Sequence, residues 1–119
     1  KIPQQKVMKK YFATDLGVQV ETAIINQDAF TIQELKSNAT KAYLDLRKLP
    51  VPPDAVQFHK YFMAMLKLIP FILNIPAPDV LENEYDAVSN FWYDQAQAYL
   101  VLTQKINQEM SRLQIKYGG

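Results

Sequence analysis

The positions of glycine and proline constrain the fold of this 119-residue chain more than any other feature of its sequence. Only three glycines occur, and two of them are the last two residues. The seven prolines lie at position 3, within residues 50–53 and within residues 70–78. The long segments between these positions lack both helix-disfavouring residues, which favours helices joined by short, stiff turns.

Apolar side chains recur every three or four residues in four segments, as on one face of a helix. This spacing predicts helices over about residues 4–27, 31–49, 54–69 and 79–117. Short turns between successive helices favour antiparallel neighbours. We therefore expect a single all-α domain over residues 1–119, an antiparallel (up-down-up-down) four-helix bundle with a long C-terminal helix.

Several residues predict where these helices begin and end. Thr31 and Glu34 have the spacing of a capping box, with Thr31 at the N-cap, and Phe30 would pack on Leu35 as a hydrophobic staple. Pro70 is expected to kink or stop the third helix, because its ring clashes with the preceding turn. The predicted apolar face of the second helix is Leu35, Ala39, Ala42, Leu46 and Leu49. That of the third helix is Val56, His59, Met63, Leu66 and Ile69, with Ala55 and Phe62 beside it.

The composition excludes many kinds of functional site. Cysteine is absent, which excludes disulfide scaffolds, thiolate metal sites and cysteine nucleophiles, and the single histidine excludes a His–His metal pair within one chain. Thirteen Lys and Arg against twelve Asp and Glu give a net charge of +1, far from the basic excess of nucleic-acid binders. No serine has the surroundings of a nucleophile elbow. We expect no enzyme activity, no cofactor, no metal and no nucleic-acid partner.

The longest apolar stretch, residues 62–75, contains Lys67, Pro70 and Asn74. It is too short and too interrupted for a transmembrane span. His59 lies on the expected apolar face of the third helix. A haem or metal ligand is one interpretation of it, and a histidine at the edge of the core, bonded to a carboxylate or a backbone carbonyl, is the one we favour.

Charged and aromatic clusters supply the candidate binding residues. No acid precedes Asp15, so the lysines before it form a basic start, and no Lys or Arg lies between Lys67 and Lys105, so the acids there are unbalanced. Either cluster predicts electrostatic docking or a solvated helix end, and two of the acids, four apart on one helix, would also suit a divalent cation. Three adjacent aromatics, residues 91–93, cannot all face one core. The apolar segment after Pro70 predicts either a docking patch or a plug for the bundle end. The candidate partner-binding residues are Lys6, Lys9, Lys10, Phe71, Ile72, Leu73, Glu82, Asp86, Trp92 and Tyr93.

The stretch from Leu46 to His59, which contains Leu-Pro-Val-Pro-Pro, resembles the helix–proline turn–helix junction of small secreted and lipid-anchored helical bundles. In outline the chain is also similar to the four-helix extrinsic subunits on the lumenal side of photosystem II. Both resemblances concern architecture and turn style, and they imply an extracytoplasmic accessory protein without assigning site residues.

The sequence thus predicts a non-enzymatic interaction module that docks on a protein partner in a larger membrane-associated or surface assembly. The expected location is extracytoplasmic: periplasm, cell surface or thylakoid lumen. The alternative is a small-molecule sensor or carrier with an aromatic pocket between helices, lined by Trp92, Tyr99, Phe62 and Met63.

Overall fold

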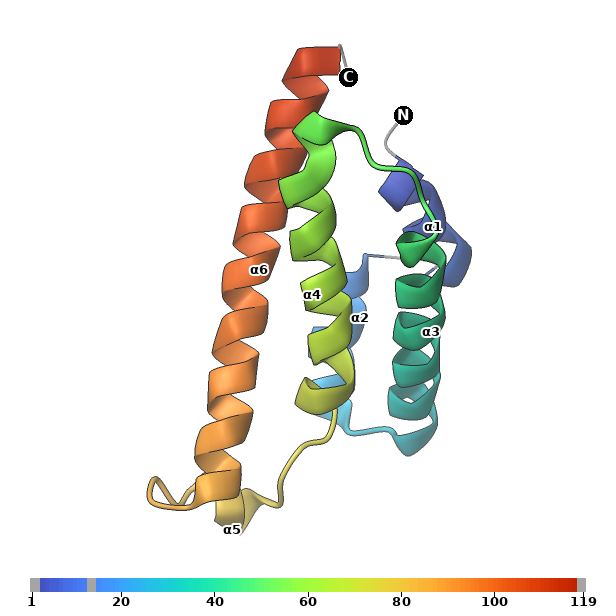
Figure 1. Cartoon of the computed structure of the whole chain (residues 1–119). Coiled ribbons are helices and arrows are strands. Elements are labelled where there is room, and N and C mark those ends of the chain that lie inside the picture. The colour runs from blue at the N-terminus through green and yellow to red at the C-terminus, as the bar shows by residue number, and fades with distance from the viewer. Residues whose placement is uncertain (1–2, 13–14, 118–119) are drawn as a thin grey trace.

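The computed structural model describes residues 3–12 and 15–117, and every regular element within these ranges is a helix (Figure 1). The expected all-α class is confirmed. The elements in chain order are α1 (Pro3–Tyr11), α2 (Leu16–Asn26), α3 (Ala29–Arg47), the 3-10 helix η1 (Pro53–Ala55), α4 (Val56–Ile72), α5 (Pro78–Leu81) and α6 (Ala87–Tyr117).

Helix α4 is central to the packing. It lies between α3 and α6 and makes its most extensive contacts with these two helices, while α1 and α2 pack on α3 (Figure 1). The molecule is elongated, with principal extents of 49 × 27 × 21 Å. Helix α5 lies at one end of the molecule, and both chain termini point toward the other end.

The core is built from one face of each long helix. The predicted face of α3 is confirmed for Leu35, Ala39, Ala42 and Leu46, which are all buried, whereas Leu49 lies beyond the end of the helix and is half-buried. The predicted face of α4 is confirmed for Leu66 and Ile69, which are buried, but Val56, His59 and Met63 are only half-buried. The full set of buried side chains on α4 is Phe58, Phe62, Met65, Leu66, Ile69 and Ile72.

The continuous helix expected over residues 4–27 is wrong, because α1 ends at Tyr11 and α2 begins at Leu16. Asp15 is the N-cap of α2, and its carboxylate accepts a hydrogen bond from the backbone N–H of Val18 at 3.2 Å. An aspartate that binds the amide three residues ahead starts a new helix. Gly17 makes room for this cap, since a Cβ there would lie 3.1 Å from the Asp15 carboxylate.

The N-cap of helix α3 lies three residues before the predicted one. Asp28 occupies the N-cap position, and the predicted capping box at Thr31 is wrong. The Thr31 hydroxyl instead donates a hydrogen bond to the Asp28 carboxylate at 2.5 Å, which holds the pKa of that carboxyl below its ordinary value. The predicted hydrophobic staple is wrong too, because Phe30 is 74% exposed.

Pro70 does not stop α4, which continues to Ile72. The helix closes at Leu73, whose backbone N–H donates to the carbonyl of Ile69 at 3.0 Å. A proline this near the C-terminus of a helix removes one backbone hydrogen bond. Only two helical residues follow it, so the helix can end soon after the proline without being interrupted. The third helix therefore extends past the predicted end at residue 69.

The helix expected over residues 79–117 is also divided. The four-residue α5 ends at Leu81, and α6 begins only at Ala87. Asp86 caps α6, because its carboxylate accepts the N–H groups of Val88 at 2.8 Å and Ser89 at 3.2 Å. With 31 residues, α6 is about 46 Å long, close to the full length of the molecule.

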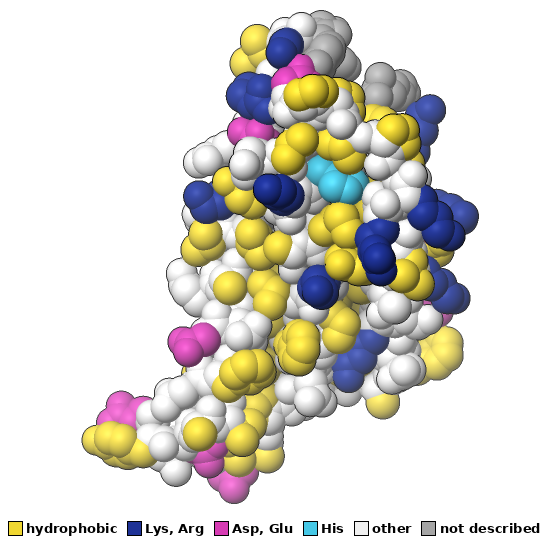
Figure 2. All heavy atoms as spheres, in the orientation of Figure 1, with side chains coloured by type: hydrophobic (Ala, Val, Ile, Leu, Met, Phe, Trp, Pro, Cys, Tyr) yellow, Lys and Arg dark blue, Asp and Glu magenta, His cyan; other side chains and the backbone are white. Residues whose placement is uncertain are grey.

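The charges are unevenly distributed over the surface. Figure 2 shows Lys and Arg side chains scattered over the face formed by α3, α4 and α6. Asp and Glu side chains gather at the end where α5 lies, with a smaller group at the opposite end. The molecule therefore presents an acidic end beside a predominantly basic face.

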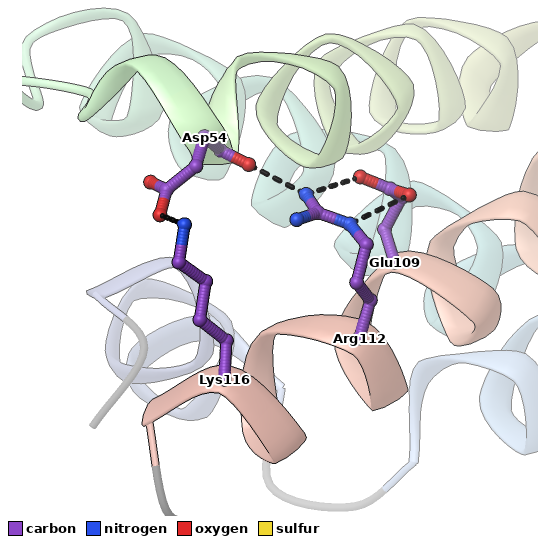
Figure 3. A network of polar contacts seen from close by, with 4 residues as sticks. All are labelled: Asp54, Glu109, Arg112 and Lys116. Carbon is purple, nitrogen blue, oxygen red and sulfur yellow. Dashed lines mark hydrogen bonds and ion pairs between the residues drawn. The ribbon is translucent and has the colours of Figure 1, made fainter.

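A polar network ties the last turns of α6 to the start of α4 (Figure 3). Lys116 pairs with the Asp54 carboxylate at 2.8 Å, and Arg112 donates to the Asp54 backbone carbonyl at 2.5 Å. Glu109 holds the Arg112 guanidinium at 2.8 Å from the same helix face. This network fixes the end of the α4–α6 pair opposite α5.

Candidate functional site

The strongest candidate surface lies where the end of α4, the short α5 and the first turns of α6 meet. Five apolar side chains there are more than half exposed, and three exposed carboxylates accompany them. We call this surface the acidic aromatic end and define it by Phe71, Tyr85, Val88, Phe91, Tyr93, Asp79, Glu82 and Glu84.

Two rings form the apolar centre of the acidic aromatic end. Phe71 of α4 and Phe91 of α6 contact edge to face, with centroids 6.2 Å apart and ring planes at 78°. Each ring remains 53% exposed. An edge-to-face pair orients both rings, so this apolar patch has a defined shape before any partner binds.

Hydrogen bonds hold the backbone beneath these rings. The indole N–H of Trp92 donates to the carbonyl of Ile72 at 2.9 Å and so satisfies a free carbonyl at the end of α4. The buried Ser89 hydroxyl donates to the carbonyl of Leu81 at 3.3 Å, which ties α5 to α6. The scaffold of the acidic aromatic end is therefore fixed from both neighbouring helices.

The predicted docking segment after Pro70 is divided between core and surface. Ile72 and Leu73 are buried in the core, so the prediction that they face a partner is wrong for this structure. Only Phe71 of the three points outward. Trp92 is half-buried and links α6 to the end of α4 through its hydrogen bond to Ile72. Tyr93 is 51% exposed and packs edge to face on Trp92, with ring centroids 5.2 Å apart.

Glu82 and Asp86 do not share a helix face, contrary to the prediction. Glu82 is the C-cap that follows α5, and Asp86 is the N-cap of α6. The described part of the chain contains no group of three or more His, Asp or Glu side chains placed to hold a metal ion. The exposed carboxylates of Asp79, Glu82 and Glu84 belong to α5 and the segment that joins it to α6, at the same end of the molecule as the exposed rings.

The lysines of α1 lie away from the acidic aromatic end (Figure 1). Lys10 pairs with Asp45 of α3 at 3.5 Å, and the Tyr11 hydroxyl donates to the same carboxylate at 2.6 Å. The bond from Tyr11 is the main reason that the pKa of Asp45 is lowered, and it raises the pKa of Tyr11. Lys10 thus holds α1 on α3, while Lys6 and Lys9 remain exposed.

His59 is half-buried and contacts an amide side chain, not the carboxylate or backbone carbonyl expected from the sequence. Its Nδ1 lies 3.1 Å from Nε2 of Gln4, so the neutral ring accepts the hydrogen bond. Burial lowers the pKa of His59, which favours that neutral form. Gln4 is only 3% exposed, and its place in the core was not predicted.

The predicted aromatic pocket is not formed by its four residues. Trp92 donates a hydrogen bond to the end of α4, Tyr99 is buried, and Met63 is half-buried. Of the four, only Phe62 lines the groove of about 580 Å³ that lies between α1 and α6.

None of the helices in residues 3–12 and 15–117 combines the length and the apolar character needed to cross a bilayer. The chain was compared with models of protein families, with curated protein sequences and with solved structures, and none of them matched it.

Proposed function

We propose that this chain is a non-enzymatic protein-interaction module that docks on its partner through the acidic aromatic end. The observation that carries the proposal is the pair formed by Phe71 and Phe91, which is ordered by its own ring contact and yet half exposed. Aromatic side chains are enriched at protein interfaces, and apolar patches rimmed by polar residues mark interaction sites.

The charge of the rim defines the partner's chemistry. Asp79, Glu82 and Glu84 are exposed, and the acid-rich segment between Lys67 and Lys105 contains no compensating Lys or Arg. A complementary partner presents apolar side chains flanked by Lys or Arg, so that opposite charges steer the encounter and the rings supply the buried area. Because hydrogen bonds already fix the scaffold, little ordering is needed on docking.

The finer architecture belongs to this proposal as well. In it, α1 and α2 together take the place of the first helix of an antiparallel, up-down-up-down four-helix bundle, with α3, α4 and α6 as the other three. The lack of cysteine and the proline-rich turn before η1 support an extracytoplasmic accessory subunit of a membrane-associated or surface assembly.

The experiment compares wild-type chain with Phe91→Ala, using Phe30→Ala as the matched control. Phe30 is also an exposed phenylalanine, but it lies at the start of α3 outside the acidic aromatic end. Each protein is immobilised, exposed to solubilised native membranes, and the bound proteins are quantified at low and at raised salt. We expect one protein to be captured by wild type and by Phe30→Ala, and to bind Phe91→Ala at least about fivefold more weakly.

Added salt should weaken this capture, since exposed charges are screened. A Glu82→Lys, Glu84→Lys double variant should lose both affinity and salt dependence. Equal capture by wild type and Phe91→Ala would refute the proposal, as would the absence of any protein that distinguishes them. If the partner is a second copy of this chain, sedimentation will show that the purified wild-type chain self-associates and that Phe91→Ala does not.

A further inference from the structure

A groove of about 580 Å³ runs between α1 and α6, well away from the acidic aromatic end. This volume lies within the range of small-molecule sites in proteins. Residues of α1, α2, α4 and α6, together with Phe12 and Asp15 next to the first two helices, line it: Gln5, Met8, Lys9, Phe12, Asp15, Leu16, Gly17, Phe62, Met65, Thr103, Ile106, Asn107 and Met110.

The two walls of the groove are matched helix faces. The α1 wall uses residues 5, 8, 9 and 12, and the α6 wall uses residues 103, 106, 107 and 110. Both sets have the spacing of one helix face over two turns, which gives walls about 10 Å long. Nε2 of Gln5 lies 3.4 Å from Sδ of Met110, so the walls run in opposite directions and touch at that end.

The apolar part of the lining is adaptable. Three of the chain's four methionines, Met8, Met65 and Met110, line the groove together with Phe12 and Phe62. Methionine is flexible and polarisable, and it adapts to ligands of varied shape. The lining therefore favours a flexible apolar ligand over a rigid polar one.

The rim of the groove is polar. Lys9 and Asn107 are exposed on opposite walls, and Lys9 takes part in none of the ion pairs among the described residues. Asp15 lies at the other end of the α1 wall, at the N-cap of α2. An anionic group is attracted by Lys9 and repelled by Asp15, so its favourable position is beside Lys9.

A partner helix does not fit this groove. Packed helices have axes 8–10 Å apart, so a helix between two others must separate them widely. The direct contact from Gln5 to Met110 leaves no such separation. The occupant must be slender, with a cross-section close to that of one side chain.

From this geometry we propose that the groove binds a monoanionic amphiphile with a single acyl chain, the class that fatty acids represent. The acyl chain lies along the three methionines of the lining, and the carboxylate pairs with Lys9, with the amide of Asn107 as a second donor. This site is independent of docking at the acidic aromatic end.

The test is a titration of the full chain, labelled with ¹³C at its methionine methyl groups, with dodecanoate below its micelle concentration. We expect saturable shifts of the Met8, Met65 and Met110 signals. Met63 is the internal control, because it does not line the groove and its signal should stay in place. Shifts of all four signals, or of none, would overturn the proposal.

Two pairs of variants sharpen the test. Thr103→Trp places a large ring in the groove and should abolish the shifts, whereas Gln104→Trp on the exposed neighbouring position should not. Lys9→Gln should weaken dodecanoate binding about two- to fivefold and leave the binding of dodecanol unchanged, since an exposed ion pair contributes modestly. Lys6→Gln, which does not touch the groove, is the control. The proposed site would be refuted if Thr103→Trp bound dodecanoate as wild type does. It would also be refuted if the methionine shifts depended on the protein concentration and not on the dodecanoate concentration.

Discussion

Replacing Tyr99 with phenylalanine tests the packing of α6 against the core, because it removes one buried oxygen and nothing else. Tyr99 is 8% exposed, and its hydroxyl is buried without a hydrogen-bond partner among the described residues. A buried polar group left unsatisfied costs about 1–3 kcal/mol. We therefore expect Tyr99→Phe to raise the free energy of unfolding by about 1 kcal/mol at neutral pH, the low end of that range.

The same hydroxyl gives an alkaline signature. Burial, reinforced by the nearby charge of Asp15, raises the pKa of Tyr99 from 10.0 to about 12. Because the folded-state pKa is above the unfolded one, this tyrosine's ionisation leaves the free energy of unfolding unchanged below pH 10 and lowers it as the pH rises toward 12. Each unit of difference corresponds to about 1.4 kcal/mol, so this loss approaches about 3 kcal/mol in wild type and vanishes in Tyr99→Phe.

Urea denaturation followed by far-UV circular dichroism measures both effects, at neutral pH and between pH 10 and 11. Tyr85→Phe is the matched control, because that tyrosine is 87% exposed and should change stability little at either pH. A Tyr99→Phe protein that is less stable than wild type by 1 kcal/mol or more would refute the reasoning, since its hydroxyl would then be hydrogen-bonded in solution.

Three further predictions follow from burial and capping. Burial lowers the pKa of His59 from 6.5, so the free energy of unfolding should fall as the pH drops below that value. His59→Gln should flatten this part of the profile of stability against pH. An unchanged profile would show that other groups cause the pH dependence. Leu73→Ala should cost about 2–5 kcal/mol in urea denaturation and Phe71→Ala only about 1 kcal/mol, because the first side chain is 2% and the second 53% exposed; equal losses would contradict these placements. Asp86→Ala should lose about 1 kcal/mol by uncapping α6, while Asp79→Ala serves as the control; equal stability of the two variants would show that α6 starts elsewhere.

Periodicity predicted the helical class well, because apolar spacing reports directly on which face is buried. The face of α3 followed from Leu35 and Leu46 with two alanines between them. Helix boundaries were harder, since they depend on which polar residue occupies the N-cap position. Asp15, Asp28 and Asp86 all occupy N-cap positions in the structure, and that residue type was the available sequence signal for the divided helices.

The candidate site was only partly predictable for a related reason. Neighbouring residues Phe71, Ile72 and Leu73 have similar hydrophobicity, so the sequence could not tell which one faces solvent until the helical phase beyond Pro70 was known. The groove depends on the spacing between α1 and α6, which are far apart in sequence. Tertiary packing sets such distances, and no local pattern encodes them.

The indole of Trp92 provides this protein with its own optical label. It is the chain's only tryptophan, it is bonded to the last turn of α4, and it contacts Tyr93 at the edge of the acidic aromatic end. Its fluorescence therefore reports on the junction of α4 and α6, whereas circular dichroism averages over every helix. If α1 and α2 detach before the α4–α6 pair separates, the two signals will give different transition midpoints, and unfolding will not be two-state.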